Sequence, residues 1–181
     1  MKNNSYPADL IKNVQLKDGT EMILRPIQPM DGDQAEVFRG KLSTQSIYAR
    51  FLGYIPSTSQ KLIDRLTNID YAKEMAIVAE AQNKNENEKE VIAIGRIAGE
   101  QDLGADFAII IADDWQGRGL GSILTEYMIE IAIDMKFSKI YASVFSTNTR
   151  MLEILRQKGF TIRKDDYTTY YAELILPVGD K

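Results

Sequence analysis

The sequence predicts a mixed α/β fold: a central, mostly antiparallel sheet with helices on both faces. Strand-like and helix-like segments alternate along the chain, and three successive apolar runs in its middle are short enough to be strands. A longer segment that follows them carries an apolar stripe at helical spacing. With 181 residues, of which 44% are hydrophobic and 27% charged, the chain is expected to form one domain over 1–181, with a core from about 14 to 176.

The first third of the chain predicts a hairpin followed by three helices. Asp18-Gly19, a pair typical of tight turns, separates two short apolar runs. Each of the next three segments opens on Asp or Ser, whose side chains accept hydrogen bonds from free backbone N–H groups at a helix start. The expected elements are strands at 14–16 and 21–27 and helices at 31–42, 43–52 and 57–67.

The rest of the chain predicts the centre of the sheet and the helices that cover it. The polar stretch 82–90 is expected to be a hairpin loop. From Gly119, apolar residues recur at i, i+3, i+4, i+7, i+8, i+11 and i+15, which predicts a long helix packed on the sheet. The expected elements are strands at 74–81, 91–98, 105–112, 140–145, 161–163 and 168–176 and helices at 119–135 and 148–158.

Composition excludes several classes of chemistry. The chain has no Cys and no His, which excludes disulfide frameworks, thiol nucleophiles, zinc fingers and Ser-His-Asp triads. A net charge of -4 without a basic block argues against nucleic acid as a partner. No secretion signal and no membrane-spanning run is recognisable, so a cytoplasmic location without membrane contact is expected. The oligomeric state stays open.

A glycine-rich junction between a strand and the long helix is the most informative stretch. Gly117, Gly119 and Gly121 let the backbone approach a ligand, and the helix start offers unpaired N–H groups suited to a phosphate or pyrophosphate. Arg118 is expected to add positive charge. A dinucleotide fingerprint would need glycine where Ser122 stands, and a P-loop would need Gly-Lys-Ser/Thr, so neither fits. The alternative is that the glycines only serve a tight turn.

These residues resemble a known superfamily. Gln116-x-x-Gly119-x-Gly121 is similar to the acyl-CoA pyrophosphate loop of GNAT-type N-acetyltransferases. Further blocks resemble the Pat-type protein-lysine acetyltransferases, and together the similarity covers about 21–163. The matching blocks are Ser146-x-Asn148-x-x-Met151-Leu152 with Gly159-Phe160, Leu24-Arg25-Pro26-Ile27, Tyr48-Ala49-Arg50-Phe51, 70–76 and 113–119.

The resemblance implies an acetyl-CoA-dependent N-acetyltransferase in which an amine attacks the thioester directly, with no metal and no covalent enzyme intermediate. It also implies that the strands at 105–112 and 140–145 run parallel and splay apart to admit the pantetheine arm. The implied cofactor-binding residues are Ile109, Ile110 and Ile111 along the strand, Gln116, Gly117, Arg118, Gly119, Leu120, Gly121 and Ser122 around the pyrophosphate, and Asn148 and Met151 beside the arm.

Direct attack requires a neutral amine, although a lysine ammonium has an ordinary pKa of about 10.4, so either a base or a dry pocket must help to remove the proton. Asp106 interrupts an apolar strand and is the first candidate; alternatively it caps the turn after Gly104. The Pat-type pattern has Glu here as general base, and Asp shortens its reach by one methylene. Glu74 is the second candidate; alternatively it is an exposed strand-end charge. Leu155 stands where many superfamily members carry a Tyr that protonates the leaving thiolate, so no general acid is assigned.

Three functions remain open at this point. The first is acetyl transfer to a protein lysine ε-amine, which the Pat-type blocks favour. The second keeps the chemistry but has a small amine as acceptor. The third is a non-catalytic acyl-CoA sensor, because Asp106 and Leu155 depart from common catalytic residues.

Overall fold

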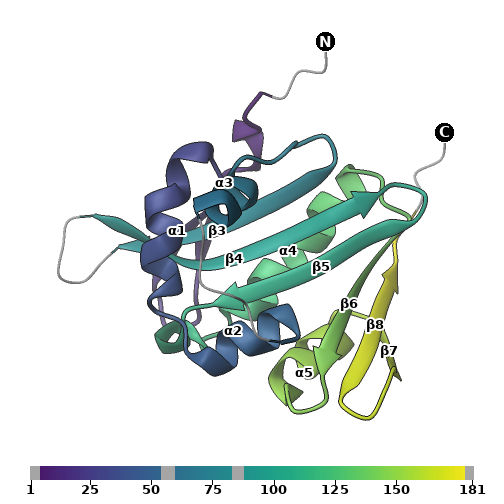
Figure 1. Cartoon of the computed structure of the whole chain (residues 1–181). Coiled ribbons are helices and arrows are strands. Elements are labelled where there is room, and N and C mark those ends of the chain that lie inside the picture. Colours follow the sequence, from purple (N-terminus) through teal and green to yellow (C-terminus); the bar gives the residue numbers. More distant parts are fainter. Residues whose placement is uncertain (1–4, 54–59, 83–87, 178–181) are drawn as a thin grey trace.

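The computed structural model describes residues 5–53, 60–82 and 88–177. Within them, eight strands form one sheet in the order β1-β2-β3-β4-β5-β6-β8-β7, with helices on both faces (Figure 1). The strands are β1 (Lys12–Gln15), β2 (Glu21–Pro26), β3 (Glu74–Gln82), β4 (Lys89–Glu100), β5 (Gly104–Ile111), β6 (Lys139–Phe145), β7 (Thr161–Lys164) and β8 (Thr169–Ile175). The helices are α1 (Gly32–Arg39), α2 (Thr44–Phe51), α3 (Gln60–Thr67), α4 (Leu120–Asp134) and α5 (Thr149–Gln157), with short 3₁₀ turns at Ala8–Leu10, Pro29–Asp31 and Asp113–Trp115. The predicted mixed α/β fold is confirmed.

The contact between β5 and β6 is the unusual part of the sheet. Every other strand pair is antiparallel, whereas β5 and β6 run parallel and pair at two positions, Ala105 with Ile140 and Asp106 with Tyr141. Beyond Asp106 the two strands share no register, although both continue for several residues. This confirms the expected splay and divides the sheet into two halves.

Two apolar layers hold the helices on the sheet. Behind it, α4 buries Leu120, Leu124, Met128 and Ile131, each at most 1% exposed, so the long helical stripe is confirmed. On the other face, α1, α2 and α3 lie in front of the β3–β5 region (Figure 1). A smaller cluster, which includes Phe38, joins α1 to the sheet.

The helix caps agree with the sequence at one site and differ at another. Ser43 caps α2 as expected, because its hydroxyl accepts from the backbone N–H of Ser46 at 3.2 Å. Asp31 does not cap α1: its buried carboxylate accepts from the backbone N–H of Gln28 at 2.6 Å and forms an ion pair with Arg25. The ion pair with the partly buried Arg25 guanidinium therefore replaces the expected cap. The expected start of the third helix at 57–59 and the centre of the predicted 82–90 loop lie outside the described residues.

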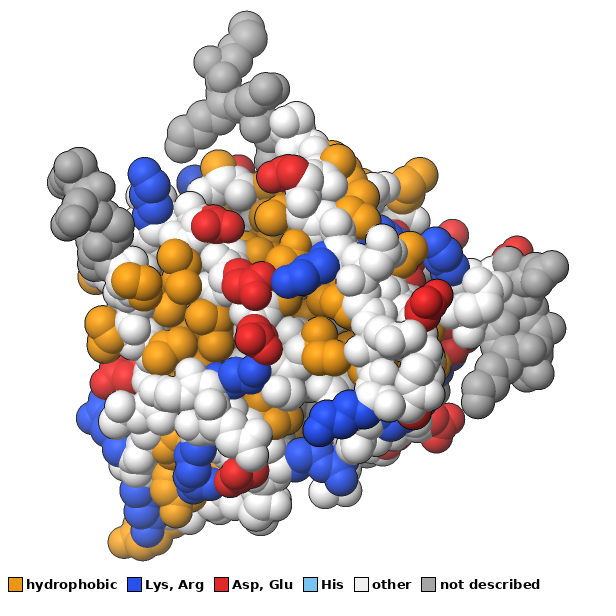
Figure 2. Space-filling view, turned by 180° about the vertical axis from the view of Figure 1, so that it is seen from behind, with side chains coloured by type: hydrophobic (Ala, Val, Ile, Leu, Met, Phe, Trp, Pro, Cys, Tyr) orange, Lys and Arg blue, Asp and Glu red, His pale blue; other side chains and the backbone are white. Residues whose placement is uncertain are grey.

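The face behind the sheet carries interspersed acidic and basic side chains (Figure 2). On α4, Glu130 pairs with Lys12 at 3.0 Å and Glu126 pairs with Lys158 at 2.8 Å. No helix in the described part of the chain is long and apolar enough to cross a membrane.

Candidate active site

The glycine junction forms a tight turn with exposed backbone donors. Gly117 and Gly119 have φ angles of +78° and +92°, which only glycine adopts without strain. The N–H groups of residues 117–119 meet no hydrogen-bond acceptor in the described part of the protein. Gly121 serves packing instead, since a Cβ there would lie 3.0 Å from the Ile154 methyl on α5. The tight-turn interpretation is therefore correct as far as it goes, but the same turn leaves donors free for an anion.

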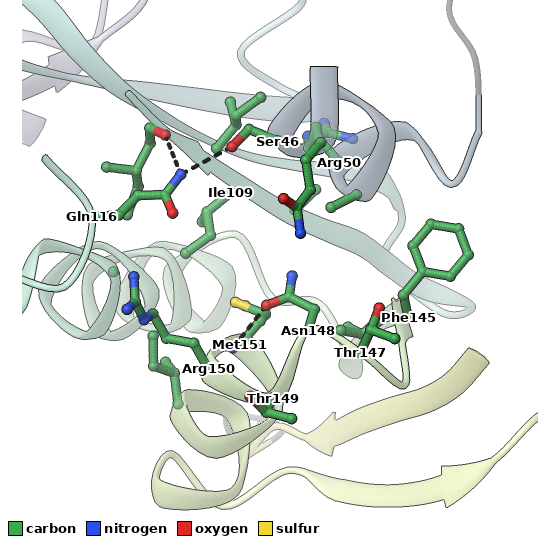
Figure 3. Close-up of a pocket in the computed structure, with 18 of the residues that line it drawn as sticks. Ser46, Arg50, Ile109, Gln116, Phe145, Thr147, Asn148, Thr149, Arg150 and Met151 are labelled. Carbon is green, nitrogen blue, oxygen red and sulfur yellow. Dashed lines mark hydrogen bonds between the residues drawn. The ribbon is translucent and has the colours of Figure 1, made fainter. Parts of the chain in front are cut away.

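Gln116 ties this loop to α2. Its side-chain amide Nε2 lies 3.1 Å from the Ile111 carbonyl and 3.1 Å from the Ser46 hydroxyl (Figure 3). Ser46 in turn donates to the Asp113 carboxylate at 2.7 Å. These bonds fix the loop between the end of β5 and the first turns of α2.

A cavity of about 880 Å³ lies where β5 and β6 part, between α2 on one side and α5 on the other. Most of the cofactor-binding residues expected from the sequence line it: Ile109, Ile110, Ile111, Gln116, Gly117, Gly119, Gly121, Ser122, Asn148 and Met151. Leu120 does not, because its side chain is fully buried in the core. Arg118 does not line it either.

Arg118 points away from the cavity, toward the β1–β2 turn. Its guanidinium donates to the Asp18 carboxylate at 2.6 Å and to the Thr20 hydroxyl at 2.9 Å, and it lies 4.3 Å from the centre of the Trp115 ring. The positive charge that the sequence assigned to the loop is thus already paired within the protein.

Asn148 has two roles that its side chain can fill together. Its Oδ1 accepts from the backbone N–H of Met151 at 3.2 Å and so caps α5. Its amide nitrogen points toward the cavity (Figure 3). A capping residue is held in place by the helix it starts, which keeps this donor fixed at the cavity wall.

Asp106 occupies the last paired position before the strands part. It is exposed, and no described residue donates a hydrogen bond to its carboxylate, so the turn-cap alternative finds no support. The surrounding protein nevertheless removes enough water to raise the pKa of Asp106 above its ordinary value, and the Arg50 guanidinium opposes part of that rise. Arg50 comes from α2 and lines the cavity, and burial lowers its own pKa.

Glu74 lies on the same face of the sheet as Asp106, in a line across neighbouring strands, but its carboxylate is paired with another residue. Glu74 pairs with Ala98 and Ala98 pairs with Asp106, so the two acids share a face two strands apart, about 10 Å. The Glu74 carboxylate forms a short ion pair with Arg96, which also donates to the Leu66 carbonyl. Glu74 is thus a strand-end charge, as the alternative expected, but it is partly buried and paired with Arg96 and not exposed.

The surface beyond Asp106 is open and aromatic. Tyr141 continues the row on β6 and stacks on Tyr171 of β8, with ring centres 6.0 Å apart and both side chains partly exposed. Glu173 pairs with Tyr141 in the next position of the same row. The candidate base therefore faces a surface that a large molecule can approach.

Comparison with known proteins identifies the family. The profile of the acetyltransferase (GNAT) family matches residues 45–160. An acetyltransferase of Pseudomonas aeruginosa is 32% identical over 151 residues, which are 83% of this chain and 80% of that protein. This chain belongs to the GNAT family of acetyltransferases.

Two Pat proteins are also similar to this GNAT chain. The acetyltransferase Pat of Mycolicibacterium smegmatis is 28% identical over 171 residues, 92% of this chain, and the match spans 49% of Pat. The structure of the GNAT domain of S. lividans PAT superposes with a TM-score of 0.84 at 26% identity, covering 95% of this chain and all of that domain.

A second structure shares the fold alone. Spermidine N-acetyltransferase from Vibrio cholerae, in complex with CoA and spermine, has a TM-score of 0.66 at 19% identity, with 85% of this chain and 95% of that one covered. GNAT acetyltransferases use an acyl-CoA and an amine acceptor, and neighbours of this chain bind acetyl-CoA or CoA.

Arg50 and Arg150 are the two basic residues among the described residues on the cavity lining, and the sequence pattern assigns a role to neither. Arg50 belongs to the block Tyr48-Ala49-Arg50-Phe51, which resembles the Pat-type enzymes, and no sequence motif marks Arg150. Arg150 lies two residues after Asn148, so its place in the first turn of α5 was predictable. Its position opposite the glycine loop was not, because that depends on how α5 packs against α4.

Proposed function

We propose that this GNAT protein transfers an acetyl group from acetyl-CoA to the ε-amine of lysine in a protein. The observation that carries the proposal is the unpaired, exposed carboxylate of Asp106 at the point where β5 and β6 part. Asp106 is not among the residues that line the cavity, but it directly precedes Phe107, the first residue of β5 that does, so a base there lies at the edge of the cavity and is exposed at the surface.

The cavity fits acetyl-CoA in shape and in the chemistry of its donors. The free N–H groups of Gly117 and Gly119 suit the diphosphate, and the parted backbone at Ile109 and Ile111 offers groups to the pantetheine arm. The amide of Asn148 faces the same space. When bound, acetyl-CoA supplies the acetyl group as a reactive thioester.

Asp106 prepares the acceptor in this proposal. Its carboxylate accepts a proton from the lysine ammonium, directly or through one water, so that the neutral amine can attack. A raised pKa makes the carboxylate a stronger base than an ordinary aspartate. Position 155 is a fully buried leucine and has no phenol that could protonate the leaving thiolate.

An acceptor on a protein fits the surface around Asp106. Tyr141 and Tyr171 present a partly exposed aromatic surface beside the carboxylate, and the alkyl chain and charge of lysine pack well on such rings. The similarity to Pat supports the same acceptor class. A small amine, such as a polyamine or an amino acid, is the competing acceptor.

Incubation with acetyl-CoA and separate panels of proteins and small amines, read by mass spectrometry, tests the acceptor. We expect a mass increase of one acetyl group on lysines of proteins, and a much smaller acetylated fraction with the Asp106→Asn variant under the same conditions. Transfer only to small amines would show that the acceptor is a small amine and not a protein lysine. Binding of acetyl-CoA without transfer to any acceptor would indicate a sensor.

Arg50→Gln tests the electrostatics of the base. The positive charge of Arg50 favours the carboxylate form of Asp106, so its removal should raise the pKa of Asp106 further. A ¹³C NMR titration of protein labelled at aspartate measures this pKa, and the signal missing from the spectrum of Asp106→Asn identifies the Asp106 resonance. The acidic limb of the plot of kcat against pH should move to higher pH in parallel. Arg39→Gln, an exposed arginine at the end of α1, is the control. An unchanged or lowered pKa would show that Arg50 does not act on Asp106.

A further inference from the structure

The structure assigns to Arg150 on α5 the role of the cation that contacts a phosphate group of CoA. Arg118, within the loop, does not have this role. This inference rests on the proposed acetyl-CoA site and names a residue of it. Arg118 is paired with Asp18 and Thr20 and stacks on Trp115, which leaves the loop without a free cation of its own.

Arg150 reaches the loop from the opposite wall of the cavity. Its guanidinium atoms lie 3.6 to 3.7 Å from the point where a Cβ on Gly117 would stand. The side chain rises from α5 toward the first turn of α4 (Figure 3). It is exposed, it lines the cavity, and it forms no ion pair or hydrogen bond with any described residue.

The surrounding backbone adds positive charge at the same place. α4 and α5 both begin beside this part of the cavity, and neither has an acidic residue in its first turn. An arginine in the first turn of a helix is unfavourable for that helix, because it faces the positive end of the dipole. Asp113, the one acidic residue among the described residues that line the cavity, already accepts hydrogen bonds from Ser46 and Gln116. A bound anion is what makes this grouping of positive charge favourable.

The chemistry of the site selects a phosphate. A guanidinium offers donors in a planar fork that matches two phosphate oxygens, and the free N–H groups of Gly117 and Gly119 can reach further oxygens of the same ligand. CoA carries two sources of this chemistry, the diphosphate and the 3′-phosphate of its ribose. The two sources are separated by comparing CoA with dephospho-CoA, which lacks only the 3′-phosphate.

The test measures the Kd of both ligands by calorimetry for the wild type, Arg150→Ala, Arg118→Ala and Arg156→Ala. Arg156 lies on the same helix as Arg150 but does not line the cavity, so it is the matched control for loss of one charge. We expect Arg150→Ala to weaken CoA binding about tenfold or more, as loss of a charge-assisted hydrogen bond does. Arg156→Ala and Arg118→Ala should each change the Kd less than about threefold.

The ligand pair then identifies the phosphate. An equal loss with CoA and dephospho-CoA places Arg150 on the diphosphate, and a loss with CoA alone places it on the 3′-phosphate. Binding to Arg150→Ala should also depend less on potassium chloride concentration than binding to the wild type. Without ligand, Arg150→Ala should melt at the same temperature as the wild type or higher, because an unfavourable charge is removed.

Three results would overturn the inference: a Kd within twofold of the wild type for both ligands, an unchanged salt dependence, or a larger loss with Arg118→Ala than with Arg150→Ala. The inference and the proposed function fail in different ways. If the wild type itself does not bind CoA at millimolar concentration, the proposed function falls and takes the inference with it. If the wild type binds and transfers acetyl while Arg150→Ala behaves like the wild type, the inference alone falls.

Discussion

Asp106→Asn should lower kcat about 100-fold with the best acceptor found by mass spectrometry, at saturating acetyl-CoA and neutral pH. Positioned general bases contribute about 10²- to 10⁴-fold, and the low end applies because aspartate reaches less far than glutamate. Asparagine has nearly the same shape but cannot accept the ammonium proton. The measurement is steady-state release of CoA, followed with a thiol reagent that the chain, having no cysteine, does not consume.

Stability and ligand binding separate this result from simple damage. The protein around Asp106 disfavours its charged form, so removal of the charge should leave the melting temperature of the free protein unchanged or higher. Binding of acetyl-CoA should be retained. Asp102→Asn, which removes an exposed carboxylate from the turn before β5, is the matched control and should keep full kcat. Undiminished turnover of Asp106→Asn at every pH would remove Asp106 as the base.

Asp106→Glu asks whether the shorter side chain limits the reaction. Because Asp106 stands at the last paired position of β5 and β6 and is exposed, a longer side chain has room there. We expect kcat equal to or above that of the wild type, since glutamate reaches the acceptor without a bridging water. A large drop would mean that the distance set by aspartate is itself required.

The elements of the fold could be predicted because their signals are local. The apolar stripe from Leu120 to Ile131 depends on helical spacing alone, and the turn at Asp18-Gly19 on two adjacent residues. The loop glycines were recognisable for the same reason, since the positive φ of Gly117 and Gly119 is a property of each residue's own backbone. These features do not depend on contacts with distant parts of the chain.

The partners of the charged side chains could not be predicted because they come from distant segments. Arg118 pairs with Asp18, 100 residues earlier, and that contact decides which way its guanidinium points. Asp31 looked like a helix cap, but Arg25 on β2 draws its carboxylate inward. Glu74 meets Arg96 only because β3 and β4 are neighbours. The partner of each of these charged side chains is determined by tertiary packing, and residue spacing in the sequence does not reveal it.

The splayed strands connect these observations to function. Pairing stops after Asp106 and Tyr141, so the backbone of β5 from Phe107 onward is released from β6 and lines the cavity instead. The same break places Asp106 at the inner end of the opening, on the face where Tyr141 and Tyr171 are partly exposed. One interruption of the sheet therefore creates both the cavity proposed for the cofactor and the position of the proposed base.

Acetyl-CoA at about 100 times its Kd should raise the melting temperature by roughly 5 to 11 °C, and Gly119→Glu should abolish this rise. Ligand at that excess stabilises the folded state by about 2.7 kcal/mol, and each kcal/mol corresponds to roughly 2 to 4 °C for a domain of this size. A Cβ on Gly119 would meet no atom within 4 Å, so a glutamate has room to extend into the open space in front of the loop. Its negative charge would repel the diphosphate there.

Gly119→Ala is the matched control for this experiment. Both variants force a side chain onto a backbone with φ of +92°, which should cost about 1 to 2 kcal/mol and lower the melting temperature of the free protein by similar amounts. Only the glutamate adds charge, so the alanine variant should keep most of the rise with acetyl-CoA. Equal loss in both variants would mean that loop conformation, and not charge, controls binding. No rise in the wild type at millimolar acetyl-CoA would show that the glycine loop is structural here, and the proposed acetyltransferase activity would fall with it.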